Sequence, residues 1–384
     1  MELISKRVVL HFPGFEPLDG AAHRARYERS ARQSGKVWRF EAETGAAETE
    51  SHPLRFTVHA KAAAWQTETI VHVFDHNEML QALRRKSLAR QLADGFIAAG
   101  RIVIDGAMAG YFKHAWRFGL FFIFPFLLMS LGMLATAAIA LLPLLAGLAL
   151  WQLIWSGPLA ALFFKFLFLP FTERFHTLHL FADWEMAVAL GRMDRPDFDA
   201  FLARVTAAAR AALAEPADEY LVSSHSMGSS VAAHVIGKLL EDEPQLFDGK
   251  RVVFASLGSA VLQCALLKPA TILRDRVGRI ARNASIFWLD VQCLTDAIHF
   301  YKVPVAAVTG HPDAKPATML FMRVKQMLTP EHYKKIKLDF LRVHRQYVLG
   351  ADRQGSFDFT LLTAGPLRGE VVADGKLMAL SSAP

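Results

Sequence analysis

The stretch that decides the fold reads Tyr-Leu-Val-Ser-Ser-His-Ser-Met-Gly-Ser-Ser at residues 220–230, and Val-Ala-Ala-His-Val-Ile-Gly-Lys-Leu-Leu follows at residues 231–240. Its apolar first part predicts a buried strand, and the periodicity from residue 229 onward predicts a helix. Only a sharp turn fits between the two elements, with Ser226 at its apex. Such a turn exposes the Ser226 hydroxyl where the strand ends, and the first N–H groups of the helix point to the same place. The stretch therefore indicates a nucleophilic serine.

Strand patterns and helix patterns alternate along the rest of the chain. Apolar or alternating runs predict strands at residues 7–11, 37–40, 55–59, 70–75, 220–224, 251–255 and 286–291. Periodic runs predict helices at residues 21–33, 77–99, 198–214 and 229–240. This alternation favours an α/β fold with a doubly wound, mainly parallel sheet that is covered on both faces. Sheets of this kind carry their functional residues just after the carboxyl ends of strands.

A long apolar run interrupts this pattern. Residues 118–164 contain no Asp, Glu, Lys, Arg or His. A helix that spans a bilayer needs about 20 apolar residues, so the run predicts a transmembrane hairpin of two helices. We place its turn at residues 140–147, where a proline and a glycine interrupt the pattern. A buried core hairpin is disfavoured because no polar face is present. Residues 159–171, which include Lys165, are expected to end the second span and enter the interface rather than form a third span.

Charge predicts how this hairpin is oriented. Basic residues lie on both sides of it: Arg84, Arg85, Lys86, Arg90, Arg101, Lys113 and Arg117 before, Lys165 and Arg174 after. Positive flanks on both sides favour two cytoplasmic ends and an even number of spans. The net charge of +7 is then expected to face anionic lipid, because no nucleic-acid motif accompanies it. An N-terminus without a secretory signal and a content of two cysteines favour a reducing cytoplasm for the globular part.

The turn at Ser226 resembles the nucleophile elbow of the α/β-hydrolases of the serine esterase and lipase type. The elbow of that family reads Gly-x-Ser-x-Gly, and this chain has Ser224-His225-Ser226-Met227-Gly228, with serine in place of the first glycine. The resemblance implies one hydrolase-like domain in two parts, residues 1–112 and 173–384. Residues 113–172 are then an inserted transmembrane hairpin.

A serine nucleophile needs a base, and the base needs an orienting acid. The resemblance implies the chain order serine, acid, histidine. Asp296 is the candidate acid because its surroundings are similar to the strand-plus-aspartate segment of the family, and Asp290 is the alternative. His344 is the candidate base because it stands in a His-x-x-Tyr segment similar to the one that carries the catalytic histidine. His311 is the alternative base, whereas His299 follows Asp296 too closely.

The resemblance also implies an oxyanion hole made of backbone N–H groups. One donor is Met227, directly after the nucleophile. The other belongs to the loop His-Phe-Pro-Gly-Phe at residues 11–15, which resembles the His-Gly loop of the family. Phe15 is our choice there and Phe12 the alternative, because Pro13 has no N–H. His225 is expected to have no catalytic role, and the Leu-Gly-Ser turn at residues 257–259 is expected to form a pocket wall.

Together these features predict a membrane-anchored serine hydrolase that cleaves a carboxylic ester of a lipid or another apolar acyl group. The expected location is the inner or cytoplasmic membrane, with two spans and the catalytic domain in the cytoplasm. The expected partners are the lipid bilayer and the apolar ester, with no nucleic acid, no cofactor and no metal; the oligomeric state is left open. Two alternatives stand beside this hypothesis: a membrane scaffold or binding protein with a degenerate hydrolase fold, and an acyltransferase with the same triad.

Overall fold

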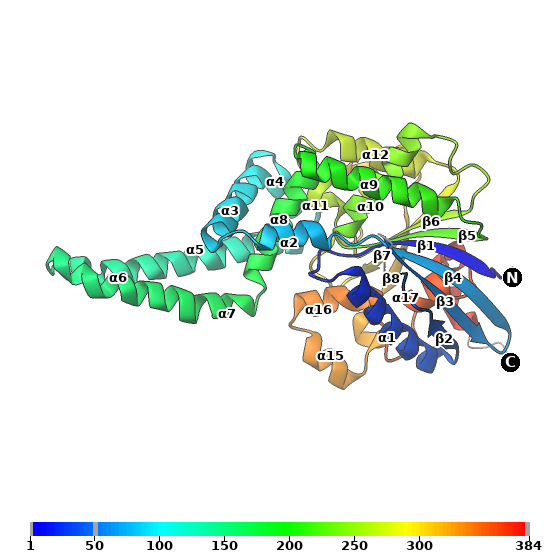
Figure 1. Ribbon diagram of the computed structural model, residues 1–384, viewed down its shortest axis with the longest axis horizontal. Helices are drawn as coiled ribbons and strands as arrows, with labels where there is room; N and C mark the ends of the chain where they lie inside the picture. Colours follow the sequence, from blue (N-terminus) through cyan, green and yellow to red (C-terminus); the bar gives the residue numbers. More distant parts are fainter. Residues whose placement is uncertain (1–2, 49–52, 381–384) are drawn as a thin grey trace.

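A mostly parallel sheet forms the centre of the computed structural model, which describes residues 3–48 and 53–380. In these residues the sheet has eight strands in the order β2-β3-β4-β1-β5-β6-β7-β8 (Figure 1). The strands are β1 (Lys6–Phe12), β2 (Glu41–Thr44), β3 (Leu54–Ala62), β4 (Trp65–Val73), β5 (Glu219–His225), β6 (Val252–Leu257), β7 (Ile286–Cys293) and β8 (Thr318–Met322). Among them β3 alone runs antiparallel to the rest. The predicted mixed α/β fold with a mainly parallel sheet is therefore confirmed.

The sheet joins the parts of the chain that precede and follow the apolar run. Strand β1 pairs in parallel with β4 on one side and with β5 on the other, so that Val9 lies between Val71 and Leu221. Residues before and after the hairpin thus form one structural unit. All of the parallel strands end at the same edge of the sheet. In Figure 1 the N-terminus marks the far end of the molecule, and β1 runs from there toward the hairpin.

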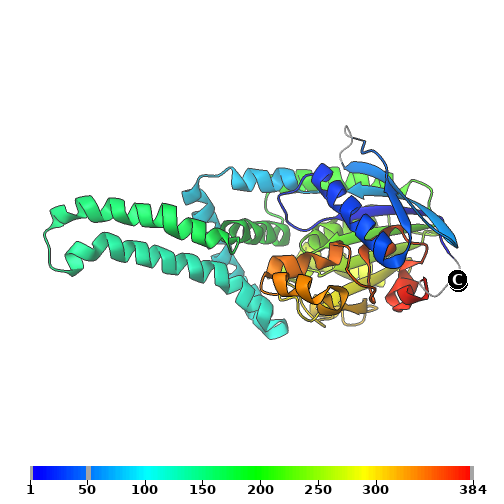
Figure 2. The ribbon, with the colours of Figure 1, turned by 90° about the horizontal axis from the view of Figure 1, so that it is seen from below.

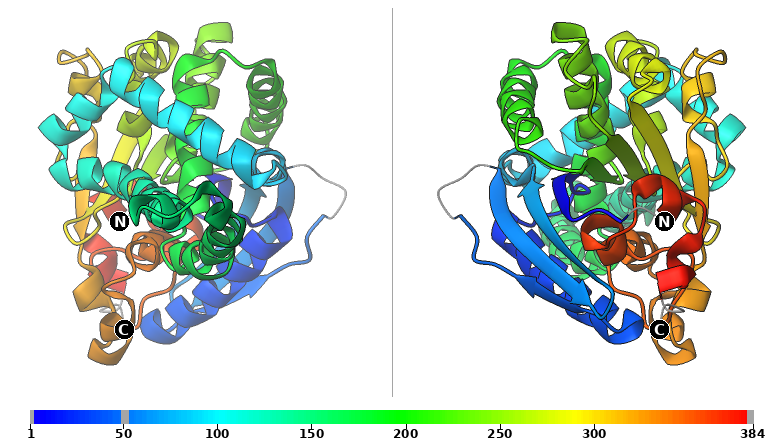
Figure 3. Two further views of the ribbon diagram at one scale, coloured as in Figure 1. Left: turned by 90° about the vertical axis from the view of Figure 1, so that its left-hand side faces the viewer. Right: turned by 90° about the vertical axis from the view of Figure 1, so that its right-hand side faces the viewer.

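Both faces of the sheet are buried, as the continuous apolar strands predict. Val8, Leu10 and Phe12 of β1 enter one apolar core, and Val9 enters the other. The first core is closed by α9 (Pro196–Leu213), α10 (Gly228–Asp242) and α12 (Thr271–Arg282). The second core is closed by α1 (Gly20–Trp38), α17 (Phe359–Ala364) and α18 (Gly369–Ala373). Figure 3 shows these helices on the two sides of the twisted sheet.

Further helices outside the hairpin connect these layers. They are α2 (Asn77–Arg84), α3 (Leu88–Ile104), α4 (Ala107–His114), α8 (Thr177–Arg192), α11 (Val261–Ala265), α13 (Val305–Val308), α14 (Val324–Met327), α15 (Pro330–Ile336) and α16 (Phe340–His344).

Two local predictions were wrong. Residues 37–40 were expected to be a strand, but α1 continues to Trp38 because the buried indole extends the apolar face of that helix. Arg39 then ends the helix with a φ of 61°. The helix expected at residues 77–99 is two helices, and the second begins where the Ser87 side chain accepts a hydrogen bond from the Arg90 N–H (3.3 Å). The short strands β2 and β8 were not predicted.

The apolar run forms a helical hairpin that projects from the sheet and its covering helices, which we call the sheet domain (Figures 1 and 2). Helix α5 (Trp116–Leu145) is followed by a turn and by a second helical stretch, Leu150–Glu173. That stretch contains α6 (Leu153–Leu162), a π-helical segment (Phe163–Phe168) and α7 (Leu169–Glu173). In the described residues these two helices are long and apolar enough to cross a membrane. The turn falls at Gly147, with a φ of 74°, whereas Pro143 remains inside α5.

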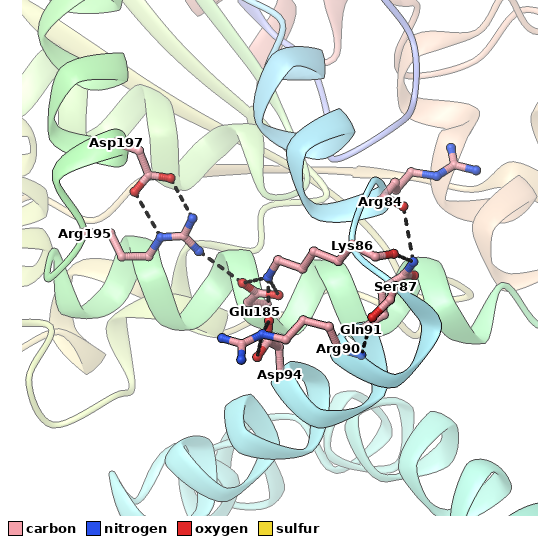
Figure 4. A network of polar contacts seen from close by, with 9 residues as sticks. All are labelled: Arg84, Lys86, Ser87, Arg90, Gln91, Asp94, Glu185, Arg195 and Asp197. Atoms are coloured by element: carbon pink, nitrogen blue, oxygen red, sulfur yellow. Dashed lines mark hydrogen bonds and ion pairs between the residues drawn. The ribbon is translucent and has the colours of Figure 1, made fainter.

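A network of ion pairs holds α3 against α8, on either side of the hairpin in sequence (Figure 4). Lys86 Nζ lies 2.7 Å from both Asp94 Oδ2 and Glu185 Oε1, and Arg195 Nη1 lies 3.1 Å from Glu185 Oε1. Arg90 also pairs with Asp94 (3.0 Å). Lys86 and Arg90 were expected to face anionic lipid, but their charges have protein partners. Arg84 and Arg85 are exposed.

Candidate active site

The turn between β5 and α10 has the sharp geometry that its sequence predicts. Ser226 adopts a φ of 53°, a left-handed conformation that costs a residue with a side chain about 1–2 kcal/mol. Three backbone hydrogen bonds maintain it. The Ser226 N–H donates to the Leu257 carbonyl oxygen (3.1 Å), and the Ser226 carbonyl oxygen accepts from Ala260 (3.2 Å) and Ser229 (3.0 Å). Ser226 keeps partial solvent exposure although residues on both sides of it are buried. Strain held in this way at an exposed serine is typical of functional sites.

The two small residues that flank the turn have different surroundings. A Cβ atom at Gly228 would lie 2.3 Å from the backbone oxygens of Phe12 and Pro13, so only glycine fits there. Ser224 is buried, but its hydroxyl has room and partners: it donates to the Ala255 carbonyl oxygen (3.2 Å) and lies 3.1 Å from Ser229 Oγ. Serine in place of the first glycine is thus compatible with the same turn.

His344 and Asp296 form a buried pair near this turn. His344 Nδ1 lies 2.7 Å from Asp296 Oδ2, to which the Tyr347 hydroxyl also donates (3.1 Å). The Ile298 N–H donates to the other carboxyl oxygen (2.9 Å). Burial alone would raise the pKa of Asp296, but the charges of His344 and His299 and these hydrogen bonds hold the pKa well below its ordinary value. The carboxylate therefore stays ionised and fixes the Nδ1–H tautomer of His344.

The other nitrogen of His344 is free to accept a proton. His344 Nε2 is buried and has no hydrogen-bond partner among the described residues. No hydrogen bond joins it to Ser226 Oγ in that part of the chain. The His225 and His344 ring centroids lie 4.7 Å apart, and His225 directly precedes Ser226. The structure thus brings the histidine–aspartate pair beside the serine turn, but within the described residues His344 makes no hydrogen bond to the Ser226 hydroxyl.

His225 connects the serine turn to the backbone of His344, a contact that the sequence does not reveal. Burial and the charge of His344 lower the pKa of His225 to about 3, so its ring is neutral. Its Nε2–H donates to the His344 carbonyl oxygen (3.0 Å). The histidine was expected to have no catalytic role, and the structure gives it a positioning contact.

The alternative acid and base lie elsewhere. Asp290 accepts hydrogen bonds from Ser256 (2.8 Å) and Gln292 (2.6 Å), and burial raises its pKa to about 6. His311 donates to the Arg274 carbonyl oxygen (2.9 Å), beside α12. Asp296 and His344 are thus the pair that the structure brings together. His299 lies against the same carboxylate, with its Nδ1 3.3 Å from Asp296 Oδ2.

The loop after β1, residues 13–17, lies against the serine turn. A Cβ atom at Gly14 would lie 3.3 Å from Ser226 Cβ. His76 Nε2 donates to the Gly14 carbonyl oxygen (3.0 Å), and the Phe15 ring stacks near His76 and His179, with the centroids 6.1 and 5.5 Å away. Within residues 3–48 and 53–380, neither the Phe15 N–H nor the Met227 N–H has a hydrogen-bond partner. Both predicted oxyanion donors are therefore available, whereas Phe12 ends β1 with its carbonyl oxygen toward Gly228.

Glu16 ties this loop to two other parts of the site. Its carboxylate binds Arg26 of α1 and also Arg345, which directly follows His344. Burial would raise the pKa of Glu16, but the charges of Arg26 and Arg345 lower it to about 2. The ionised Glu16 thus links the Phe15 loop to the His344 segment. The sequence does not reveal this contact, because Arg345 lies far from Glu16 along the chain.

Both legs of the hairpin reach loops of the site. At the base of α5, Arg117 donates to the Leu294 carbonyl oxygen (3.0 Å), and the Phe118 ring packs 4.5 Å from the Phe300 ring. Leu294 and Phe300 flank Asp296 in sequence. After the second leg, His179 of α8 stacks on Phe15. The loop of Asp296 therefore packs against the base of α5, and the loop after β1 packs against α8, the helix that follows the hairpin.

Comparison with protein-family models, with curated proteins and with solved structures finds no match to this chain. In the described residues, no group of three or more His, Cys, Asp or Glu side chains is arranged to hold a metal ion. A function for this chain is therefore inferred from the geometry of the site itself.

Proposed function

We propose that the chain is a membrane-anchored serine hydrolase with an α/β-hydrolase-like fold, and that it cleaves a carboxylic ester of a lipid or another apolar acyl group. One observation carries the proposal. A partly exposed serine with a φ of 53° follows a central parallel strand, beside a buried histidine–aspartate pair. The chain order serine, aspartate, histidine is the order used by α/β-hydrolases.

In this mechanism Ser226 Oγ attacks the ester carbonyl carbon, and His344 Nε2 takes the hydroxyl proton. Asp296 holds the ring through Nδ1 and stabilises the charge that the ring acquires. The N–H groups of Met227 and Phe15 bind the oxygen on which negative charge develops. His344 then gives its proton to the leaving alcohol. Water, deprotonated by the same nitrogen, then attacks the carbonyl carbon of the acyl group, and His344 returns that proton to Ser226 Oγ as the bond from Oγ to the acyl group breaks and the carboxylic acid leaves.

The first step needs a movement that brings the two atoms together, because Ser226 Oγ makes no hydrogen bond to His344 Nε2 among the described residues. Rotation of the Ser226 side chain about its Cα–Cβ bond moves the hydroxyl without disturbing the three backbone hydrogen bonds of the turn. Catalytic hydrogen bonds are often long before substrate binds. The unpaired Nε2 atom supports this step, since a buried nitrogen acceptor without a partner is costly and gains one when the hydroxyl turns.

The apolar substrate is inferred from the hairpin. The base of α5 packs against the loop of Asp296, α8 after the second leg packs against Phe15, and many exposed residues of the hairpin are large and apolar. A hairpin seated in a bilayer would hold the carboxyl edge of the sheet beside the lipid. We propose the inner or cytoplasmic membrane as its location, with the sheet domain in the cytoplasm.

Labelling with a fluorophosphonate tests the enzymatic part of the proposal. We expect the detergent-purified protein to be labelled and to hydrolyse members of a panel of lipid esters, because Ser226 is the nucleophile. Ser226→Ala is expected to lose both properties. Ser230→Ala is the matched control, because Ser230 is a buried neighbour in α10 and should keep both.

Labelling that survives in Ser226→Ala would overturn the assignment of the nucleophile. If the wild type is neither labelled nor active on any ester, the scaffold or binding alternative is favoured instead. Transfer of the acyl group to an added alcohol rather than to water would favour the acyltransferase.

The topology is tested with introduced cysteines, because the two native thiols, Cys264 and Cys293, are buried. In intact cells we expect Leu148→Cys, in the turn of the hairpin, to react with a membrane-impermeant maleimide. Leu3→Cys should react only after the cells are permeabilised, since two spans leave the sheet domain in the cytoplasm. Reaction of Leu3→Cys in intact cells would contradict the proposed orientation.

A further inference from the structure

The segment that leads into His344 exposes an unusual combination of apolar and basic side chains. We call residues 334–342 the basic loop; it comprises the end of α15, the connecting residues 337–339 and the start of α16. Leu338 is 85% exposed and Phe340 is 57% exposed, although Ile336 on one side and Val343 on the other are buried. Large apolar side chains with this exposure mark a surface that is normally covered.

The charge of the basic loop indicates what covers it. Lys334, Lys335 and Lys337 are exposed, and none of them forms an ion pair within the described part of the chain. Asp339, the acidic residue of the loop, accepts a hydrogen bond from the Arg342 N–H (3.0 Å) and caps α16. The free charge of the loop is therefore positive. Exposed apolar side chains surrounded by lysines are suited to the headgroup region of an anionic membrane.

The position of the basic loop agrees with this occupant. Figures 1 and 2 show α15 and α16 on the side of the sheet domain from which the hairpin projects. Helix α5 has 30 residues, a length of about 45 Å at 1.5 Å per residue, whereas the hydrocarbon core of a bilayer is about 30 Å thick. The excess lies at the base of α5, where Phe118 and Phe122 are buried in the sheet domain. A bilayer around the rest of the hairpin would therefore lie close to this side of the domain.

We propose that the basic loop is a second membrane-binding surface, which inserts Leu338 and Phe340 among anionic phospholipid headgroups and holds the carboxyl edge of the sheet against the bilayer. The inference goes beyond the proposed function and rests on its membrane-anchored hairpin. Two copies of this chain could not pair symmetrically through the loop without placing like charges opposite one another. Because the loop enters α16 directly, membrane contact would also steady the helix that carries His344.

An environment-sensitive nitrobenzoxadiazole label tests the contact in the full-length protein. The label is attached to Leu338→Cys or Phe340→Cys, and the protein is reconstituted into vesicles that contain phosphatidylglycerol and a spin-labelled lipid. We expect a blue-shifted emission and quenching at both positions. Leu3→Cys is the matched control, because Leu3 is an exposed leucine near the N-terminus, at the far end of the molecule from the hairpin (Figure 1).

Two further arms make the outcome decisive. Reversal of Lys334, Lys335 and Lys337 to Glu, or the use of zwitterionic vesicles, should reduce quenching at position 338 toward the level at position 3. A label at Leu134→Cys, in the exposed surface of α5, reports whether the hairpin is in the bilayer. Quenching at 134 with none at 338 would overturn the second surface and leave the anchor intact, whereas no quenching at 134 would overturn the anchor.

A blue shift that increases with protein density and is not accompanied by lipid quenching would indicate contact with a second copy. This result would also overturn the proposal. The readout needs no catalysis, so Ser226→Ala should give the same result as the wild type. Failure of the membrane contact is thus separated from failure of the proposed activity.

Discussion

Replacing His344 with alanine is expected to lower the kcat of ester hydrolysis about a millionfold, and Asp296→Asn about ten-thousandfold. The first change removes the proton acceptor. The second keeps the shape of the side chain but presents an amide to His344 Nδ1, which favours the wrong tautomer of the ring. Residues that act as a unit are not additive, so the double variant should lose no more than His344→Ala alone. Steady-state kinetics on one ester, with protein folding checked by circular dichroism, measures all three effects.

The pH dependence of the wild type adds an independent check. The pKa of Asp296 is held well below its ordinary value by the neighbouring histidines, in spite of its burial. The carboxylate therefore stays ionised through the working range of the assay. The profile of kcat/KM against pH should therefore have no step from Asp296 as the pH falls through the ordinary range of an aspartate.

Asp290→Asn is the matched control for the acid. Asp290 contacts Ser256 and Gln292, and burial raises its pKa to about 6. Asparagine keeps the shape of this side chain, whose hydrogen bonds go to Ser256 and Gln292 rather than to His344, so kcat should remain within a few-fold of the wild type. If Asp290→Asn abolishes turnover and Asp296→Asn does not, the assignment of the acid is wrong.

The parts of the site that the sequence predicted are those that depend on local pattern. Ser226 could be placed on its turn because a strand and a helix meet with too few residues between them for any other connection. Asp296 was preferred because it follows a strand closely, whereas Asp290 lies within one. The prediction of His344 as the base depended on the resemblance of its surroundings to a short segment of the α/β-hydrolases. The pairing of His344 with Asp296 joins two loops that are far apart in sequence, and only the three-dimensional structure reveals it.

The contacts that the sequence did not predict are the long-range ones that orient these groups. In the sequence Glu16 resembles an ordinary loop carboxylate, and only the structure shows its ion pairs with Arg26 and Arg345. His225 was given no role, because its partner is a backbone oxygen of His344, which carries no sequence signal. The predicted strand at residues 37–40 failed for a related reason, since burial of Trp38 in the second core decided the local structure. Tertiary packing overrides local preference in such short segments.

The same contacts connect the hairpin to the chemistry that we propose. One leg packs on the loop of Asp296 and the other leads to His179, which stacks on Phe15. The loops of the proposed acid and of one proposed oxyanion donor are thus supported by the base of α5 and by the helix that follows the hairpin. Insertion of the hairpin into lipid would orient the site toward the bilayer and also fix the positions of these two loops.

The second large effect is expected at Gly228, where the addition of a single methyl group should abolish the proposed hydrolysis. The Cβ atom of Gly228→Ala would lie 2.3 Å from the carbonyl oxygens of Phe12 and Pro13. Both are backbone atoms, so the start of α10 and the loop after β1 must move apart. Overpacking of this kind costs about 1–3 kcal/mol of stability. Met227 and Phe15 lie on the two sides of this contact, so both N–H groups should be displaced. We expect kcat to fall at least about a hundredfold, because a displacement of catalytic groups by about 1 Å has an effect of this size in other enzymes.

Ser224→Gly is the control that isolates this steric effect, because it changes the other small residue that flanks the turn without adding a Cβ atom. It removes a hydroxyl that bonds to Ala255 and touches Ser229, and should cost about 1 kcal/mol with little change in kcat. Thermal unfolding and steady-state kinetics of the two variants separate stability from activity. Wild-type kcat in Gly228→Ala would mean that the Met227 and Phe15 N–H groups need not be held together. The oxyanion hole would then have to be sought elsewhere, because the close approach at Gly228 is what sets the spacing between these two donors.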